Sequence, residues 1–154
     1  MAFTKTLKMV ALVAIAAAFA GCQQSGGTKT DATTDATGGM APWGQGCSNT
    51  IYFDFDKSDI NAEYADCLKK GGEYLKANAG AKLTIEGNTD ERGTPEYNMA
   101  LGERRAQSVV NALTAAGGMA AQSDAVSYGE ERPAVDGHDE SAWMKNRRAV
   151  ITGK

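Results

Sequence analysis

Between residues 82 and 116 the pattern of a strand gives way, across one short polar loop, to the pattern of a long helix. Leu83 and Ile85 alternate with polar neighbours, which is typical of a strand with one buried face. Residues 95–116 repeat apolar side chains at the spacing of one buried helix face. The expected members of that face are Ala106, Val109, Val110 and Leu113. A strand and a helix of this kind bury their apolar faces against each other, so the chain is predicted to contain a layered α/β domain.

Both ends of the long helix are marked. Thr94 suits the N-cap position, Pro95 suits the first helical position, and Glu96 favours the positive end of a helix. Gly117 and Gly118 predict its end.

Shorter patterns predict the other elements. Strands are expected at residues 49–55, 82–87, 125–128 and 148–152, a helix at 62–78, and a helical turn at 141–146. Ala65, Leu68 and Leu75 are the expected inward positions of the 62–78 helix. This order of strands and helices predicts a two-layer α/β (α+β) sandwich.

The chain is predicted to begin with an export signal over residues 1–21. Lys5 and Lys8 precede an apolar run from Met9 to Phe19 that is too short to span a bilayer. The run ends in Phe19-Ala20-Gly21-Cys22, which resembles the lipobox of bacterial lipoproteins. That resemblance implies cleavage before Cys22 and acylation of this cysteine. The alternative is an ordinary signal peptide whose mature part happens to begin near a cysteine.

Residues 22–47 are predicted to form the lipidated cysteine and a flexible linker. The segment is rich in glycine and threonine, and it cannot bury enough apolar area to fold. It could extend to roughly 80 Å and hold a domain of residues 48–154 away from a membrane. Cys47 and Cys67 are left after lipidation, and an even remainder in an oxidising compartment favours a disulfide. Two buried free thiols are the alternative.

The loop and the first turns of the long helix hold the candidate site. Asp90 lies in the loop, and Asn98 and Arg105 are seven residues apart, so they share one helix face. A carboxylate and a guanidinium near a helix N-terminus suit a zwitterionic ligand, because Asp90 can bind an ammonium group and Arg105 a carboxylate. A solvated Asp–Arg surface pair is the alternative interpretation.

Other function classes are weaker. Asp54, Asp56 and Asp59 lack the glycine and glutamate of a calcium loop. The His138-Asp139 pair lacks a nucleophile elbow. A glycosidase would need two flanking carboxylates, and Glu86 and Asp90 are candidates only through their nearness in sequence. A carboxylate at a strand edge is the stronger interpretation of Glu86.

Nucleic acid is not an expected partner. Arg104-Arg105 and Arg147-Arg148 are basic pairs, but the formal charge of the chain is −3, from 16 basic and 19 acidic residues. No metal and no cofactor are expected.

The motif Thr89-Asp90-x-x-Gly93, then Asn98, then Leu101-x-x-x-Arg105-Ala106 resembles the OmpA-like peptidoglycan-binding domains. Within that family, Asp90 to Asn98 and Leu101 to Ala106 are very similar to the peptidoglycan-associated lipoproteins, and the resemblance covers residues 50 to about 151. Trp143 departs from it, because tyrosine is usual there. The resemblance implies an OmpA-like βαβαββ order with a mixed sheet.

It also implies a function without catalysis. Such domains bind the peptide stem of peptidoglycan, especially meso-diaminopimelate, with Asp90 matching the ammonium ligand and Arg105 the carboxylate ligand. Gln23 after Cys22 points by analogy to the outer membrane. A TolB-like β-propeller and other Tol proteins are the implied protein partners, and a role in envelope integrity and cell division follows. The remaining residues that match the family pocket are Phe55, Asp56, Arg92, Asn98 and Leu101, with Arg148 near it.

Overall fold

The computed structural model describes residues 41–44 and 46–154. The predicted signal segment 1–21, Cys22 and residues 23–40 of the predicted linker lie outside the described residues. Within the described part, no helix combines the length and the apolar character needed to cross a membrane.

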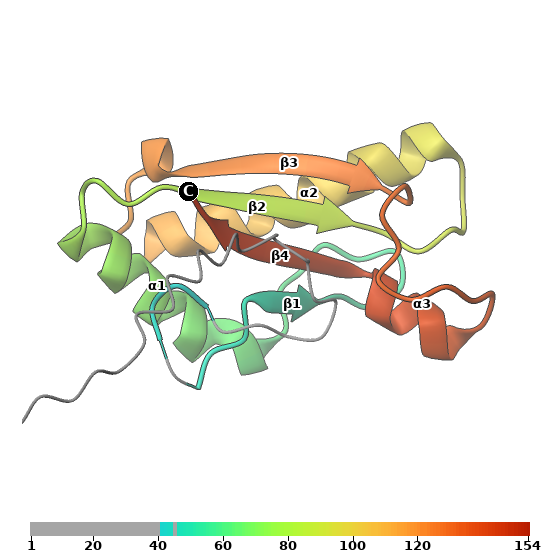
Figure 1. Cartoon of the computed structure of the whole chain (residues 1–154), viewed down its shortest axis with the longest axis horizontal. Helices are drawn as coiled ribbons and strands as arrows, with labels where there is room; N and C mark the ends of the chain where they lie inside the picture. The colour runs from blue at the N-terminus through green and yellow to red at the C-terminus, as the bar shows by residue number, and fades with distance from the viewer. Residues whose placement is uncertain (1–40, 45) are drawn as a thin grey trace, which may run out of the picture. The chain divides into compact units, whose positions relative to one another are not determined.

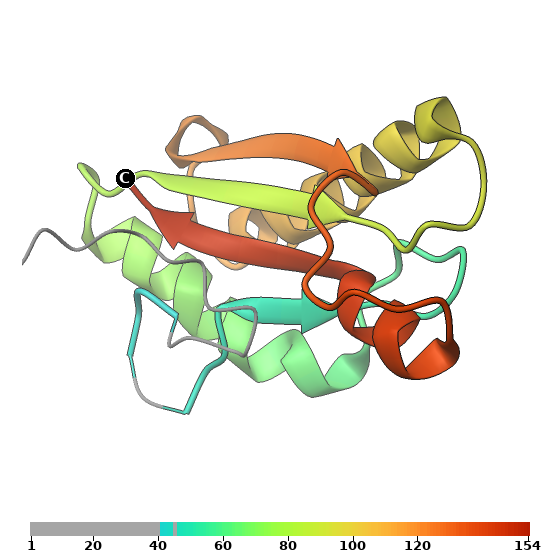
Figure 2. The ribbon, with the colours of Figure 1, turned by 45° about the vertical axis from the view of Figure 1, so that its right-hand side comes forward.

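Four strands form one mixed sheet (Figures 1 and 2). The strands are β1 (Thr50–Tyr52), β2 (Leu83–Asn88), β3 (Ser123–Gly129) and β4 (Arg148–Gly153). Their order across the sheet is β1-β4-β2-β3. β2 and β3 run parallel, whereas β4 is antiparallel to both β1 and β2. A parallel pair needs a crossover, and the long helix supplies it between β2 and β3.

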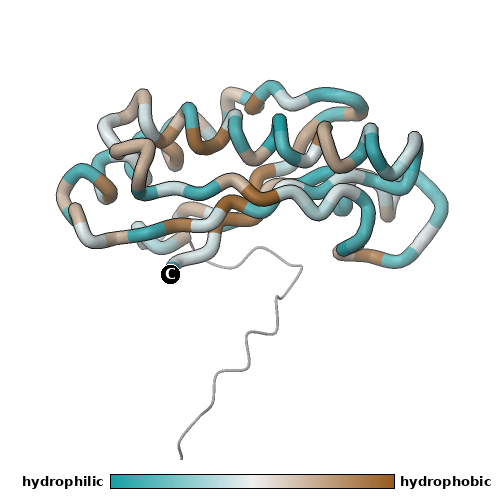
Figure 3. Tube along the Cα trace, turned by 90° about the horizontal axis from the view of Figure 1, so that it is seen from above, coloured by the Kyte–Doolittle hydropathy of each residue, from teal (hydrophilic) through white to brown (hydrophobic). Residues whose placement is uncertain are grey.

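The helices are α1 (Ala65–Ala77), α2 (Pro95–Ala115) and the short α3 (Glu140–Asn146), with 3₁₀ turns η1 (Ala62–Tyr64) and η2 (Ala120–Gln122). The first two form the second layer, and α3 lies at the end of the sheet beside the start of β4 (Figures 1 and 2). α1 and α2 cover one face of the sheet, and the view from above separates the two layers (Figure 3). The predicted two-layer sandwich with a mixed sheet is confirmed.

The core lies between α1, α2 and the sheet. The predicted positions Leu68, Leu75, Leu83 and Ile85 are buried in it, together with Ala106, Val109, Val110 and Leu113 of α2. Ala65 is exposed, so the prediction of an inward Ala65 is wrong. Ala65 is the first residue of α1 and directly follows the 3₁₀ turn at 62–64, so it lies at the end of the helix, outside the core.

The ends of α2 follow their predicted signals. The hydroxyl oxygen of Thr94 accepts a hydrogen bond from the backbone N–H of Tyr97 at 3.2 Å. At the other end, Gly117 has a φ of 114°, and the N–H of Gly118 donates to the carbonyl of Leu113 at 3.0 Å, which closes a Schellman motif. The cap at Thr94 therefore fixes where α2 begins, directly after the loop that follows β2.

Two glycines bring α2 very close to β2. A Cβ atom built on Gly87 would lie 1.9 Å from the carbonyl oxygen of Gly102. The close contact of the two backbones therefore requires that neither residue carries a side chain. It places residues 89–94, which connect β2 to α2, at the end of the sheet.

β1 is shorter than the predicted strand 49–55. The N–H of Phe53 donates to the carbonyl of Arg147, which continues the register with β4 by one residue, and the Phe53 side chain enters the core. Asp56 then adopts a φ of 57°, a left-handed conformation that aspartate tolerates better than most residues. The chain turns at residues 54–57, and this turn, which we call the 54–57 loop, lies beside the start of α2.

The folded part extends N-terminal to residue 48. Ala41 and Cys47 are buried, and Trp43 packs against the core beside Gly71 of α1. A disulfide joins Cys47 to Cys67 of α1, with Cα atoms 5.5 Å apart. The bond links the segment that enters the domain to a helix of the core.

Loss of this disulfide is expected to destabilise the domain. Closing a 20-residue separation removes chain entropy from the unfolded state, so the Cys47→Ala/Cys67→Ala variant should lose about 3 kcal/mol of unfolding free energy. Urea denaturation measures the loss against the wild-type protein. An unchanged midpoint in the double variant would show that the bond adds no stability.

Candidate functional site

A cavity of about 200 Å³ opens at the N-terminal end of α2. The 54–57 loop, the β2–α2 connection and the first three turns of α2 form its walls. Its lining residues are Phe55, Asp56, Thr89, Asp90, Arg92, Gly93, Tyr97, Asn98, Leu101 and Arg105. Every predicted site residue except Arg148 therefore lies around one cavity.

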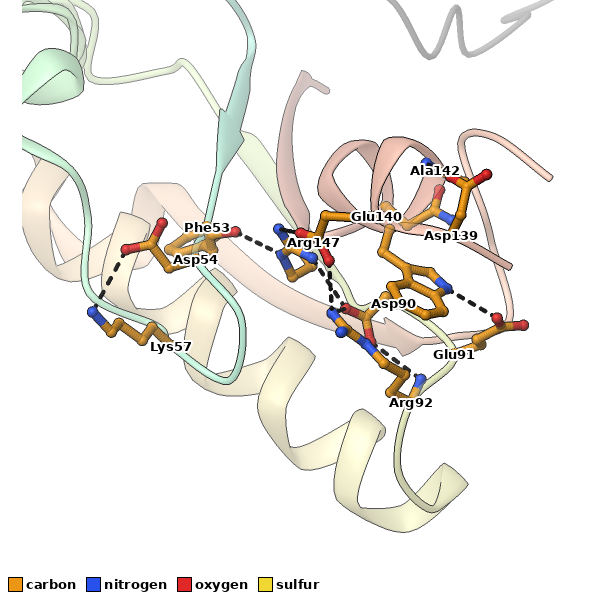
Figure 4. Close-up of polar contacts among 12 residues, drawn as sticks. Phe53, Asp54, Lys57, Asp90, Glu91, Arg92, Asp139, Glu140, Ala142 and Arg147 are labelled. Atoms are coloured by element: carbon orange, nitrogen blue, oxygen red, sulfur yellow. Dashed lines mark hydrogen bonds and ion pairs between the residues drawn. The ribbon is translucent and has the colours of Figure 1, made fainter. Parts of the chain in front are cut away.

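Asp90 is the buried acid of the site, with 4% of its surface exposed. Its Oδ1 accepts from the backbone N–H of Arg92 at 3.1 Å, and its Oδ2 accepts from Arg92 Nη2 at 2.6 Å. Arg147 Nη1 lies 3.4 Å from the same oxygen, so two arginines converge on one carboxylate (Figure 4). Burial raises the pKa of Asp90, but the hydrogen bonds and charge of Arg92 outweigh burial and bring this pKa below its ordinary value. Asp90 is therefore ionised at neutral pH.

Arg105 is fully buried, with 0% of its surface exposed. Its guanidinium donates to three backbone carbonyls: Nε to Lys57 at 2.8 Å, Nη1 to Asn88 at 2.9 Å and Nη2 to Asp54 at 3.1 Å. Burial lowers the pKa of Arg105 to about 10, so the group still carries its charge at neutral pH. These bonds use three of five donors, and the guanidinium keeps donor capacity for a ligand anion.

Arg92 lies across the mouth of the site. Its guanidinium stacks between the rings of Phe55 and Trp143, each with its centroid 4.1 Å away. It also lies 3.6 Å from Glu140 at the start of α3. Asn98, which is buried on α2, donates from Nδ2 to the Glu130 carboxylate. The loop acid, the helix amide and the guanidinium groups thus meet as the sequence predicts.

Arg148 does not line the cavity. It starts β4 and donates to the backbone carbonyls of Arg132 at 3.0 Å and Asn146 at 3.3 Å. Its neighbour Arg147 contacts Asp90 instead, because consecutive residues at the start of a strand point in opposite directions. The sequence showed an arginine pair here, and only the register of β4 decides which member faces the site.

Reasoning from the sequence also missed Tyr97, Trp143 and Thr89 as parts of the site. Tyr97 donates from its hydroxyl to Asp56, which joins the start of α2 to the 54–57 loop. Trp143 was noted only as a departure from the family pattern. Its indole N–H donates to Glu91 at 2.9 Å, and this fixes the ring beside Arg92. The available signal in the sequence was Tyr97, an aromatic residue close to the polar loop.

The residues considered for a calcium loop, a catalytic dyad and a glycosidase site do not form those sites within the part of the chain that the structure describes. Asp54 pairs with Lys57 at 3.6 Å, and within residues 41–44 and 46–154 no cluster of three metal-ligating side chains forms. His138 contacts Glu91 at 2.7 Å, whereas Asp139 caps α3, so the proposed dyad is absent from the described residues. Glu86 lies on a central strand rather than at an edge.

Comparisons with known proteins identify the family. The model of the OmpA family matches residues 52–147. The chain belongs to the OmpA family. Within the OmpA family it is 57% identical over 103 residues to the peptidoglycan-associated lipoprotein of Pasteurella multocida, covering 67% of this chain and 69% of that relative. It is 41% identical over 163 residues to the peptidoglycan-associated lipoprotein of Pseudomonas aeruginosa, covering 94% and 95%.

A solved structure agrees with these sequence matches. The crystal structure of the peptidoglycan-associated lipoprotein from Burkholderia pseudomallei matches this OmpA-family chain with a TM-score of 0.67 at 46% identity, covering 68% of this chain and 89% of that chain. The chain is therefore related to a group of lipoproteins with an OmpA domain, which is not a family of enzymes.

Proposed function

We propose that this protein is an outer-membrane lipoprotein that binds peptidoglycan non-covalently and so tethers the outer membrane to the cell wall. One observation carries the proposal: the carboxylate of Asp90 and the guanidinium of Arg105 line the same cavity of about 200 Å³. A ligand with an ammonium group and a carboxylate on one carbon complements such a pair. The meso-diaminopimelate residue of the peptide stem has this chemistry.

Burial supports the choice of a charged ligand. Asp90 and Arg105 are almost fully removed from water, so their interactions with ligand charges are weakly screened. The first turn of α2, with Thr94 as its cap, adds the positive end of a helix beside the site. Leu101 supplies an apolar wall for the methylene groups of the stem.

The anchor rests on the N-terminal segment. Cys22 follows a predicted export signal, and acylation there would place lipid in the outer membrane, with Gln23 as the sorting residue. Several acyl chains hold a protein firmly, whereas one chain holds it marginally. The linker then gives the wall-binding domain its reach.

A TolB-like β-propeller of a Tol system is proposed as a second partner at the rim of the same cavity. Phe55 is 56% exposed and Tyr97 is 44% exposed, and exposed aromatic side chains are typical anchors of protein interfaces. A partner seated on both rings would exclude the wall. Through this exchange the protein would serve envelope integrity and constriction during cell division.

Co-sedimentation with purified sacculi tests the wall-binding function. The full chain in mild detergent should pellet with sacculi that contain diaminopimelate, and a soluble diaminopimelate stem peptide should release it. Sacculi with lysine in the same position are the control for ligand chemistry. If the folded protein stays in the supernatant with both kinds of sacculi, the wall-binding function is wrong. If it still binds a TolB-like propeller, docking is its function.

A further inference from the structure

In the described structure, Asp90 already holds an internal cation. Arg92 approaches both of its oxygens, through its backbone N–H at 3.1 Å and its guanidinium at 2.6 Å. The guanidinium therefore occupies a position on the carboxylate that a ligand ammonium would need. Binding through Asp90 requires that this contact is given up or shared.

Of the two arginines on Asp90, Arg92 is the one that can move. Arg147 is 7% exposed and is held at three points, by Asp90 at 3.4 Å, by Glu140 at 2.7 Å and by the carbonyl of Phe53 at 3.0 Å. The Arg92 side chain is 30% exposed and is held beyond Asp90 by aromatic stacking and by a longer contact of 3.6 Å to Glu140. Stacking on Phe55 and Trp143 allows the guanidinium to slide between the rings without leaving them.

Charge balance decides which ligands can displace it. The buried groups near Asp90 include the cations Arg105 and Arg147, so an Arg92 that loses Asp90 keeps only its longer contact of 3.6 Å to the exposed Glu140 and is left beside like charges. A simple amine brings no anion, so its binding to Asp90 leaves the Arg92 guanidinium without a replacement for that carboxylate, which is unfavourable. A zwitterion brings its own carboxylate, to which the displaced guanidinium can donate two parallel hydrogen bonds.

From this arrangement we infer that Arg92 is a specificity-determining residue of the cavity. It substitutes for the ligand ammonium on Asp90 in the free protein, and it passes to the ligand carboxylate when a zwitterion binds. Selectivity for a stem residue with both charges over one with an amine alone follows from this exchange. The inference rests on the proposed wall-binding function and adds to it the group that discriminates between ligands.

Trp143 reports the exchange directly. Its ring stacks on Arg92, and its N–H is tied to Glu91, so departure of the guanidinium changes the surroundings of a fixed indole. The chain has two tryptophans, and Trp43→Phe leaves Trp143 as the single reporter.

Isothermal titration of the full chain in detergent tests the inference with two tripeptide stems, one ending in meso-diaminopimelate and one ending in lysine. The C-terminal carboxyl group of both stems is amidated, so the lysine residue presents an amine alone, whereas diaminopimelate keeps the amine and carboxylate of its side chain. The wild-type protein should bind the diaminopimelate stem about tenfold or more tightly than the lysine stem. Arg92→Gln should reduce that ratio by about tenfold, because lysine no longer has to displace a cation and diaminopimelate loses a partner for its carboxylate. Arg132→Gln is the matched control, since Arg132 also stacks on an aromatic ring, Tyr128, but does not line the cavity, and its ratio should equal that of the wild type.

The outcomes distinguish the role of Arg92 from the proposed wall-binding function. If Arg92→Gln weakens both stems by the same factor, Arg92 only supports the fold of the loop and the inference is wrong. If the diaminopimelate stem binds the Trp43→Phe protein without changing the Trp143 emission, the exchange does not occur. If the wild-type protein binds neither stem, the proposed ligand is wrong, and the inference falls with it.

Discussion

Replacing Asp90 with asparagine is expected to reduce the affinity for diaminopimelate-containing sacculi by about 2–5 kcal/mol, which is roughly 30-fold or more. The substitution keeps the size of the side chain and an oxygen that can accept from the N–H of Arg92, but it removes the negative charge. Arg92 and Arg105 then line the cavity with no buried carboxylate among the lining residues, and a ligand ammonium has no partner. The pellet fraction at increasing sacculus concentration measures the loss.

A matched carboxylate provides the control for this experiment. Asp124 of β3 is exposed, does not line the cavity and pairs with the C-terminal Lys154 at 2.8 Å. The Asp124→Asn variant should therefore bind as the wild type does. The pKa of Asp90 lies below its ordinary value, so wild-type binding should also persist when the pH falls from 7 to 5. Equal binding by Asp90→Asn and wild type, with both folded, would remove Asp90 from the ligand site.

Sequence patterns predicted best where local chemistry decides the structure. The cap at Thr94, the stop at Gly117 and the alternation of Leu83 and Ile85 depend on neighbours within a few residues, and α2 and β2 lie within a residue or two of their predicted bounds. β1 was predicted too long because its partner strand β4 begins only at Arg148, so the pairing ends with the contact between Phe53 and Arg147, and the chain then turns at residues 54–57. No local pattern contains that contact.

The residues of the candidate site likewise fall into those that the sequence predicted and those that only the fold identifies. Spacing on one helix placed Asn98 and Arg105 together, the loop before that helix added Asp90, and the family pattern added Phe55. The choice between Arg147 and Arg148 needed the register of β4, which a run of two arginines does not supply. The pairing of Arg92 with Asp90 needed the fold as well, because a loop of polar residues permits many side-chain arrangements.

Arg105 shows most clearly how the tertiary structure changes the interpretation of one residue. Its guanidinium closes the 54–57 loop onto the end of β2, because it donates to Asp54 and Lys57 on one side and to Asn88 on the other. The residue that is proposed to bind a ligand carboxylate therefore also builds the cavity. A loss of binding in an Arg105 variant does not by itself distinguish these two roles.

Stability measurements distinguish them. Arg105→Ala should lower the free energy of unfolding by about 3–5 kcal/mol, because it leaves buried carbonyls without donors and a void in place of a large side chain. Arg105→Lys keeps a charge but lacks the planar fork, so it should recover only part of that loss. The neighbouring Arg104 is exposed, and Arg104→Ala should change the urea midpoint little. An Arg105→Ala protein that is as stable as the wild type would show that the 54–57 loop does not depend on this guanidinium, and any loss of wall binding would then be assigned to the ligand contact alone.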